Sequence, residues 1–155
     1  MTTILITGAN GFIGSQLAAT MPVGSSLHLN HETRTVDKLV LVDYVVSDPA
    51  GGPDGAEWVE GDLGALVAGR PDLFSSADVV FHLASATSAE CEADLDLGLN
   101  ANLMAGVALG RCLAAAGHKP LLVFSSTLAI YGGTPDAPLP PVSYTHLRAH
   151  ETSLH

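Results

Sequence analysis

Basic residues, cysteines and aromatic side chains are all scarce in this chain of 155 residues. Six lysine and arginine residues face sixteen aspartate and glutamate residues, which gives a formal net charge of −10. This balance disfavours nucleic acid and anionic membranes as partners, because both require a basic face. The two cysteines, Cys91 and Cys112, are too few for a disulfide framework and suit a reducing compartment. We therefore expect a cytoplasmic protein with neither nucleic acid nor membrane as a partner.

Other signals are missing as well. No uninterrupted apolar run reaches the length of a membrane span, and the first residues lack the basic segment of a signal peptide. The histidines and cysteines lack the spacing of metal ligands, so no metal site is expected. What is present is 47% hydrophobic residues with only 14% charged ones, which argues against disorder. The length fits one domain or part of a larger protein.

Short runs rich in valine, isoleucine and leucine alternate with helix-like segments. The runs are Ile4–Ile6, Leu39–Val42, Trp58–Val59, Val79–Leu83 and Leu121–Phe124. They are almost continuously apolar, as in parallel strands that are covered on both faces. Residues 12–20 and 95–116 predict helices, and residues 27–38 are interpreted as a polar insertion. The order predicts an α/β fold, a doubly wound parallel sheet of the Rossmann type.

The strongest motif is the glycine loop TGANGFIG at residues 7–14, between the first strand and the first helix. Gly8 permits the tight turn, Gly11 lets the backbone approach a diphosphate, and Gly14 lets the helix lie close to the sheet. The unpaired N–H groups and the dipole of the helix then bind phosphate. The alternative is a purely structural turn. The placement of the loop favours dinucleotide binding.

Asp43 ends the second apolar run. A carboxylate there can accept hydrogen bonds from the adenosine ribose and would repel a 2′-phosphate, which favours NAD over NADP. The spacing from Gly14 is longer than usual because of the polar insertion. The alternative is an aspartate that caps a turn at the strand end.

On these residues the chain resembles the extended short-chain dehydrogenase/reductase family, of the NAD-dependent epimerase/dehydratase type. Further segments of residues 1–141 match this family in order: GDL at 61–63, HLAS at 82–85, Asn102 in the long helix (with Ala105 in place of a family glycine) and FSSTLAIYG at 124–132. The resemblance implies NAD as the cofactor. The cofactor-binding residues that we predict are Gly8, Asn10, Gly11, Phe12, Ile13, Gly14, Asp43, Asp62, Leu63, Leu83, Ala84, Ser85, Asn102 and Ser125.

The resemblance also implies a catalytic hydroxyl and a tyrosine base. Thr127 matches the hydroxyl that holds the substrate oxygen, and its alternative role is a hydrogen bond in the strand-end turn. Tyr144 is the candidate for the base, followed four residues later by Arg148 where the family has lysine. Arginine cannot reproduce the contacts of a compact ammonium with the phenol and the ribose, which weakens this candidate.

Residues 142–155 differ from the rest and resemble a translated reading frame of a transposase sequencing adapter. We therefore expect residues 1–141 to form an NAD-binding Rossmann domain, incomplete at its C-terminus and the N-terminal part of a larger enzyme. Residues 142–155 are expected to be a non-native tail. Since Tyr144 lies in that tail, we expect this chain to have little or no dehydrogenase activity. The alternative is an ordinary polar tail.

The segments at residues 90–98 and 116–120 look like the D-erythronate dehydrogenase branch of the family, which oxidises the 2-hydroxyl of a sugar acid to a 2-oxo group. The alternative interpretation of residues 90–96 is structural: they are the acidic start of a helix. A nucleotide-sugar epimerase or dehydratase and a non-catalytic NAD-binding module are the alternatives. The substrate is accordingly expected to be a sugar acid or a nucleotide sugar, and the resemblance suggests a homodimer of the full-length protein through the helix that begins at Leu95.

Overall fold

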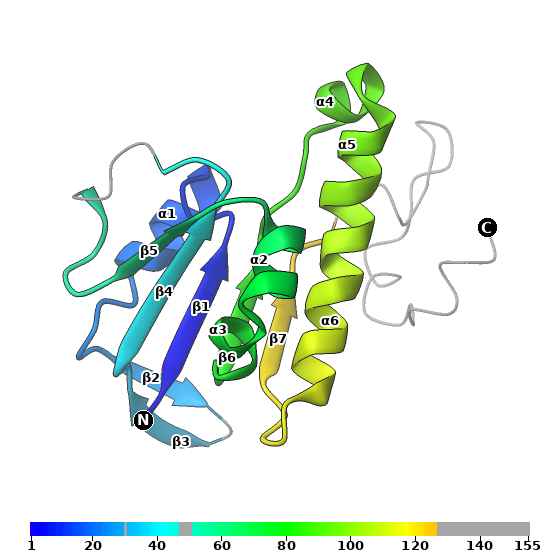
Figure 1. Ribbon diagram of the computed structural model, residues 1–155. Helices are drawn as coiled ribbons and strands as arrows, with labels where there is room; N and C mark the ends of the chain where they lie inside the picture. Colours follow the sequence, from blue (N-terminus) through cyan, green and yellow to red (C-terminus); the bar gives the residue numbers. More distant parts are fainter. Residues whose placement is uncertain (30, 47–50, 127–155) are drawn as a thin grey trace, which may run out of the picture. The chain divides into compact units, whose positions relative to one another are not determined.

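The central feature is a five-stranded parallel sheet with the strand order β5-β4-β1-β6-β7. The computed structural model describes residues 1–29, 31–46 and 51–126. The five strands are β1 (Thr3–Thr7), β4 (Lys38–Asp43), β5 (Glu57–Glu60), β6 (Val79–His82) and β7 (Leu121–Phe124). β1 lies in the middle, between β4 and β6 (Figure 1). This arrangement confirms the predicted doubly wound Rossmann fold.

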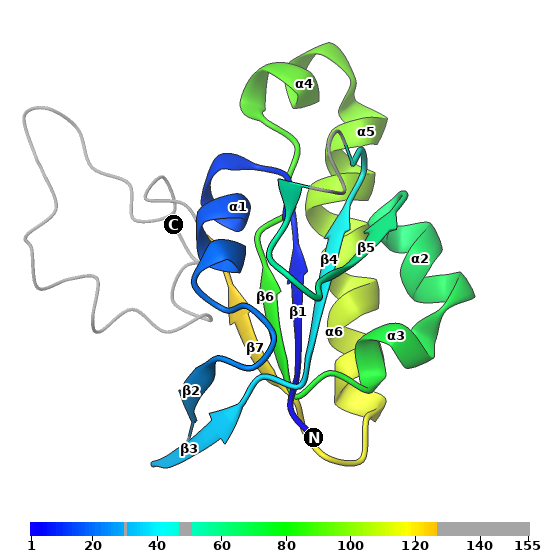
Figure 2. The same ribbon diagram turned by 90° about the vertical axis from the view of Figure 1, so that its left-hand side faces the viewer.

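Helices cover both faces of the sheet. α1 lies on one face, whereas α2, α3 and α6 lie on the other, as Figure 2 shows most clearly. The helical elements are α1 (Phe12–Ala19), α2 (Leu63–Gly69), α3 (Pro71–Ser75), α4 (Ser88–Ala93), α5 (Leu95–Leu99), the π-helical turn η2 (Asn100–Met104) and α6 (Ala105–Ala115). The predicted helices at residues 12–20 and 95–116 are therefore present, the second with a π-helical turn between two α-helical parts.

Alternate residues of β1, β4 and β6 belong to two separate cores, whereas the four residues of β7 are exposed. On β1, Leu5 packs with Phe74 and Leu109 from the helices of one face, whereas Ile4 and Ile6 pack with Ala18 of α1 on the other face. All three β1 side chains are fully buried. Because both faces are covered, the strands show no polar alternation, which is why they appear in the sequence as continuous apolar runs.

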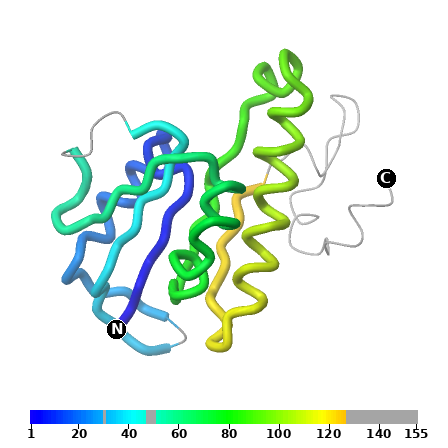
Figure 3. Tube along the Cα trace, in the orientation of Figure 1, coloured from blue at the N-terminus to red at the C-terminus, as the bar shows by residue number. Residues whose placement is uncertain are grey.

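The polar insertion forms a second, two-stranded sheet. β2 (Ser26–Leu29) pairs in antiparallel register with β3 (Glu32–Thr35), and the hairpin then returns directly into β4. The side chains of β3 are exposed along its whole length. The insertion thus lengthens the distance in sequence between Gly14 and Asp43 without separating the ends of β1 and β4, which run side by side in Figure 3.

The helical run Leu95–Ala115 comprises 21 residues and is, by length and composition alone, apolar enough to cross a membrane; it is the one such helix in the part of the chain that the structure describes. Asp96 and Arg111 interrupt its apolar residues. Three of its side chains, Ala105, Leu109 and Leu113, are buried in the protein core, as in a helix that packs on a sheet.

The chain divides into two units, Met1–Phe124 and Ser125–His155. The fold described above is that of the first unit. Of the second unit, only Ser125 and Ser126 belong to the described residues. The expected boundary at residue 141 and the expected tail, residues 142–155, lie outside them.

Candidate NAD-binding site

The site begins with the tight turn that follows β1. Gly8 has a φ of +71°, a backbone conformation that residues other than glycine rarely adopt. A Cβ atom at Gly8 would lie 2.7 Å from the backbone nitrogen of Ala84 and 2.8 Å from the carbonyl carbon of Leu83. Only glycine lets this turn lie against the segment that follows β6.

The first turn of α1 presents backbone N–H groups that no side chain caps. Gly11 is the N-cap residue, the first turn of α1 contains no acidic residue, and the Gly11 N–H donates to the carbonyl oxygen of Gly8 at 3.2 Å. A Cβ atom at Gly14 would come within 2.1 Å of that same carbonyl oxygen. Phe12 and Ile13 point outward and are 86% and 65% exposed. The amides and the dipole at this helix start suit an anion such as a diphosphate.

Asp43 fixes the loop as well as ending β4. Its Oδ2 atom accepts a hydrogen bond from the backbone N–H of Asn10 at 2.7 Å, and its Oδ1 atom accepts one from the N–H of Tyr44 at 2.7 Å. The Asn10 side chain also donates to the carbonyl oxygen of Val45 at 3.1 Å. A carboxylate has about four lone-pair sites, so hydrogen bonds to ribose hydroxyls can be added to these two.

Leu83, Ala84 and Ser85 follow β6 directly and lie next to the glycine loop. The N–H of Leu83 donates to the carbonyl oxygen of Thr7 at 3.1 Å, and the N–H of Ala84 donates to the Thr7 hydroxyl at 3.3 Å. The structure therefore brings together the residues that the sequence predicted at the ends of β1, β4 and β6. The carboxyl ends of these parallel strands are the place where open α/β sheets bind their ligands.

Two predicted residues have a structural role in the described chain. Asp62 is the N-cap of α2, because its Oδ1 atom accepts a hydrogen bond from the N–H of Ala65 at 2.8 Å. The Asn102 amide accepts from the N–H of Ala86 at 2.7 Å and donates to the carbonyl oxygen of Ala86 at 3.0 Å and to Cys91 Sγ at 3.3 Å. Asn102 therefore holds the chain just beyond Ser85.

The remaining predicted residues lie elsewhere in the chain. Leu63 is half-buried at the start of α2. Ser125 directly follows β7 and is the first residue of the second unit. Both candidate catalytic residues, Thr127 and Tyr144, lie outside the described residues.

The acidic segment at residues 90–96 starts two helices. Thr87 and Glu90 form a capping box at α4: the Thr87 N–H and hydroxyl each donate to Glu90 Oε2 at 2.7 Å, and the Glu90 N–H donates back at 3.4 Å. Hydrogen bonds from the Thr87 backbone and side chain lower the pKa of Glu90. Asp94 caps α5 by accepting from the N–H of Leu97 at 3.0 Å. The interpretation as an acidic helix start is confirmed here.

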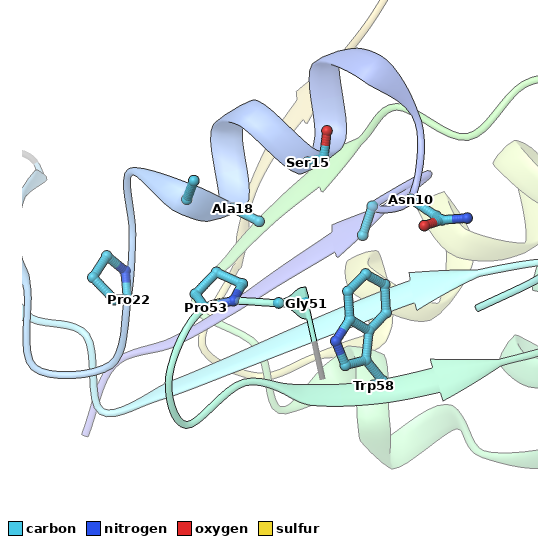
Figure 4. Close-up of a pocket in the computed structure, with 10 residues that line it drawn as sticks. Asn10, Ser15, Ala18, Pro22, Gly51, Pro53 and Trp58 are labelled. Atoms are coloured by element: carbon cyan, nitrogen blue, oxygen red, sulfur yellow. The ribbon is translucent and has the colours of Figure 1, made fainter. Parts of the chain in front are cut away.

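A pocket of about 430 Å³ lies beside α1 (Figure 4). It is bounded by α1, by residues 51–53 and by Trp58 of β5, and Asn10 is the one predicted cofactor residue that lines it. The buried Trp58 Nε1 atom has no hydrogen-bond partner within the described ranges, and a Cβ atom at Gly52 would lie 2.6 Å from it. The pocket therefore adjoins the glycine loop through Ala9 and Asn10, and the first turn of α1 through Ser15.

His82, the last residue of β6, was not among the predicted binding residues although it lies beneath the site. It is 3% exposed, and its ring is 5.1 Å from that of Phe124 between centroids. Burial lowers the pKa of His82 from the ordinary histidine value.

A pH dependence of stability follows from this shift. Above about pH 6.5 the imidazole is neutral in both the folded and the unfolded chain. As the pH falls below this value, the unfolded chain binds the proton first, so the free energy of unfolding falls by up to about 1.4 kcal/mol per pH unit until the folded pKa is passed. Urea unfolding of the wild type and of His82→Asn between pH 7.5 and 5 measures this loss. We expect a shallower pH dependence for the variant; parallel curves would contradict the assignment.

Comparison with known proteins agrees with this geometry. Residues 4–152 match the NAD dependent epimerase/dehydratase family. The chain belongs to this family, whose own description names the predicted cofactor, NAD.

Among the relatives is D-erythronate dehydrogenase of Cupriavidus necator, 39% identical over 140 residues, which cover 90% of this chain and 41% of the relative. A solved structure of a nucleoside-diphosphate-sugar epimerase from Agrobacterium tumefaciens is 32% identical, with a TM-score of 0.69 over 90% of this chain and 40% of that one. A variant of uronate dehydrogenase from the same organism, solved in complex with NAD, is 25% identical, with a TM-score of 0.60 over 91% of this chain and 49% of the other. The chain thus spans less than half the length of each of these proteins.

Proposed function

We propose that this chain is the NAD-binding part of an oxidoreductase that resembles D-erythronate dehydrogenase and oxidises the 2-hydroxyl of a sugar acid. The observation that carries the proposal is the meeting of an uncapped helix start, a glycine loop and Asp43 at one end of the sheet. The relative from Cupriavidus necator supports the choice of a sugar acid. When bound, NAD would supply the acceptor for the hydride that leaves the substrate.

The space around Gly8 and Gly14 shows whether the start of α1 is open to a diphosphate. The Cβ positions of Gly8 and Gly14 are blocked by backbone atoms, so no side chain covers the helix start from these positions. The amides of residues 12–14 would then bind the diphosphate, and the Asp43 carboxylate would bind the adenosine ribose and disfavour a 2′-phosphate. By the family resemblance, Asp62 and Leu63 would adjoin the adenine, while Leu83, Ala84, Ser85 and Asn102 would line the path of the cofactor.

The catalytic residues of this proposal are those that the family resemblance implies. Thr127 would hold the substrate oxygen, and Ser125 would adjoin the cofactor. The proton of the hydroxyl needs a base such as a tyrosine with a lowered pKa, for which Tyr144 is the candidate within this sequence. The chain as it stands is expected to bind NAD with little or no turnover, because Tyr144 lies in the expected non-native tail and has an arginine and not a lysine four residues later.

A nucleotide-sugar epimerase is the second candidate, since the epimerase from Agrobacterium tumefaciens has the higher TM-score of the two solved structures described. The third candidate is a module that binds NAD without chemistry. The proposed homodimer would use the helical run from Leu95, on which Leu99, Leu103 and Met104 are 45%, 53% and 56% exposed. The cytoplasmic location also stays a proposal.

These candidates are separated by an activity assay. The protein to assay is the full-length one, expressed from the gene whose natural sequence continues beyond codon 141. With NAD and D-erythronate we expect NADH to be released, seen as absorbance at about 340 nm, because net oxidation of a hydroxyl reduces the cofactor stoichiometrically. An epimerase would interconvert nucleotide sugars without net NADH. Absence of NADH together with epimerisation would overturn the proposal in favour of the second candidate, and NAD binding without either activity would favour the third.

A further inference from the structure

The Thr7 hydroxyl and the His82 imidazole meet in the interior directly beneath the glycine loop. Thr7 ends β1 and His82 ends β6, and the two residues are partners in the parallel register. Thr7 is fully buried and His82 is 3% exposed. The distance between Thr7 Oγ1 and His82 Nδ1 is 2.7 Å, which is a short hydrogen bond.

Thr7 also joins two segments of the site. Its hydroxyl oxygen accepts from the N–H of Ala84, and its carbonyl oxygen accepts from the N–H of Leu83. The next residue, Gly8, lies so close to Ala84 that no Cβ atom would fit between them. The position of the segment at residues 83–85 relative to the glycine loop therefore depends on Thr7.

The hydrogen bonds of Thr7 favour one tautomer of His82. A threonine hydroxyl has a single hydrogen, and its oxygen already accepts from Ala84. Among the described residues Thr7 Oγ1 has no third partner, so its hydrogen is directed to His82 Nδ1. Nδ1 is then the acceptor, and the ring is neutral with its hydrogen on Nε2.

We propose that the Thr7–His82 hydrogen bond is a positioning device for NAD binding, in which a neutral imidazole with its hydrogen on Nε2 keeps the Thr7 hydroxyl turned to accept from Ala84. The inference rests on the proposed function, since the site that it positions is the NAD site described above. Thr7 and His82 act through the backbone of residues 83–85 and are not catalytic residues.

Two pairs of variants test this role. Thr7→Val keeps the shape of the side chain without its hydroxyl, whereas Thr7→Ser keeps the hydroxyl. His82→Leu removes the acceptor, whereas His82→Asn has an oxygen close to the position of Nδ1. We expect Thr7→Val and His82→Leu to weaken NAD binding by about tenfold or more, and Thr7→Ser and His82→Asn to bind within about threefold of the wild type.

Two further measurements distinguish positioning from stability alone. First, each variant is titrated with NAD by calorimetry. The titration is made under conditions where circular dichroism and urea unfolding show that the variant is folded, so that a loss of stability is not mistaken for a loss of affinity. Long-range ¹H–¹⁵N spectra of the wild-type histidine side chains are expected to show His82 with an unprotonated Nδ1 at neutral pH. This measurement requires no NAD, and it does not depend on whether any variant folds.

The outcomes are separable. A protonated Nδ1 in the wild type, or a folded Thr7→Val chain that binds NAD as tightly as Thr7→Ser, would overturn the positioning role and leave the proposed function intact. A wild-type chain with the expected tautomer that does not bind NAD would instead overturn the proposed function, and with it the purpose of the device.

Discussion

The Gly14→Ala substitution is expected to weaken NAD binding by about a hundredfold or more and to lower the free energy of unfolding by about 2–4 kcal/mol. The added methyl group would lie 2.1 Å from the carbonyl oxygen of Gly8, far inside van der Waals contact. Because that oxygen belongs to the backbone of the tight turn, no side-chain rotation relieves the clash. The turn and the start of α1 must separate, and the amides proposed to bind the diphosphate move with them.

Gly110→Ala is the matched control. Gly110 is also a helical glycine, in α6, but apart from the backbone of its own helix no atom of the described residues lies within 4 Å of the position of its Cβ. Alanine there should raise the free energy of unfolding by about 0.5–1 kcal/mol, because glycine is a poor helix former, and leave NAD affinity unchanged. Urea unfolding and calorimetric NAD titration of both variants give the two quantities. Equal NAD affinity in Gly14→Ala and the wild type would contradict the role of the loop.

Asp43→Asn is expected to weaken NAD binding by about tenfold to a hundredfold and to reduce the preference for NAD over NADP. The two carboxylate oxygens of Asp43 accept from different backbone N–H groups, those of Asn10 and Tyr44. An asparagine must place its NH₂ group opposite one of these donors, which loosens the loop. The loss of the negative charge also removes the repulsion of a 2′-phosphate, so NADP should lose less affinity than NAD.

The matched control for this change is Asp78→Asn. The Asp78 carboxylate also accepts a hydrogen bond from a backbone N–H, that of Thr3 at 2.8 Å, but at the amino end of β1 and therefore away from the site. An asparagine at position 78 can keep its oxygen on Thr3. Affinities for NAD and NADP are measured in parallel for both variants. If Asp43→Asn binds both cofactors as Asp78→Asn does, Asp43 does not select the cofactor.

The central sheet could be predicted because its signal is local. Runs such as Leu39–Val42 are apolar at every position, and this pattern follows from burial on both faces, which the structure confirms. The glycine loop is equally local: Gly8, Gly11 and Gly14 lie within seven residues of one another and serve one turn. Short-range constraints of this kind leave a clear mark on the sequence.

The elements that escaped prediction have weaker local marks. The hairpin β2–β3 lies in a stretch interpreted as a polar insertion, because its strands have four residues each and β3 has no buried side chain. The helices α2 and α3 are short, and each buries one side chain, Val67 and Phe74 respectively. Such elements are stabilised by the sheet on which they pack more than by their own pattern.

The features of the site that the sequence did not predict are those that depend on contacts between residues distant in the sequence. Thr7 and His82 are 75 positions apart, and Asn10 and Asp43 are 33 apart. The sequence predicts that Asp43 binds the ribose, but its role as an acceptor for the loop amide becomes visible only when β1 and β4 are side by side. A threonine and a histidine that each end a strand carry no mark of being neighbours until the strand order is known.

The most direct measurement of the central claim is a titration of the ¹⁵N-labelled chain with NAD, followed by the backbone amide signals. The account predicts saturable shifts at Gly11, Gly14 and Asp43 and in residues 83–85, with none at the opposite end of the sheet, near Asp78. No saturable shift, or shifts confined to residues 51–53 and Trp58, would contradict it.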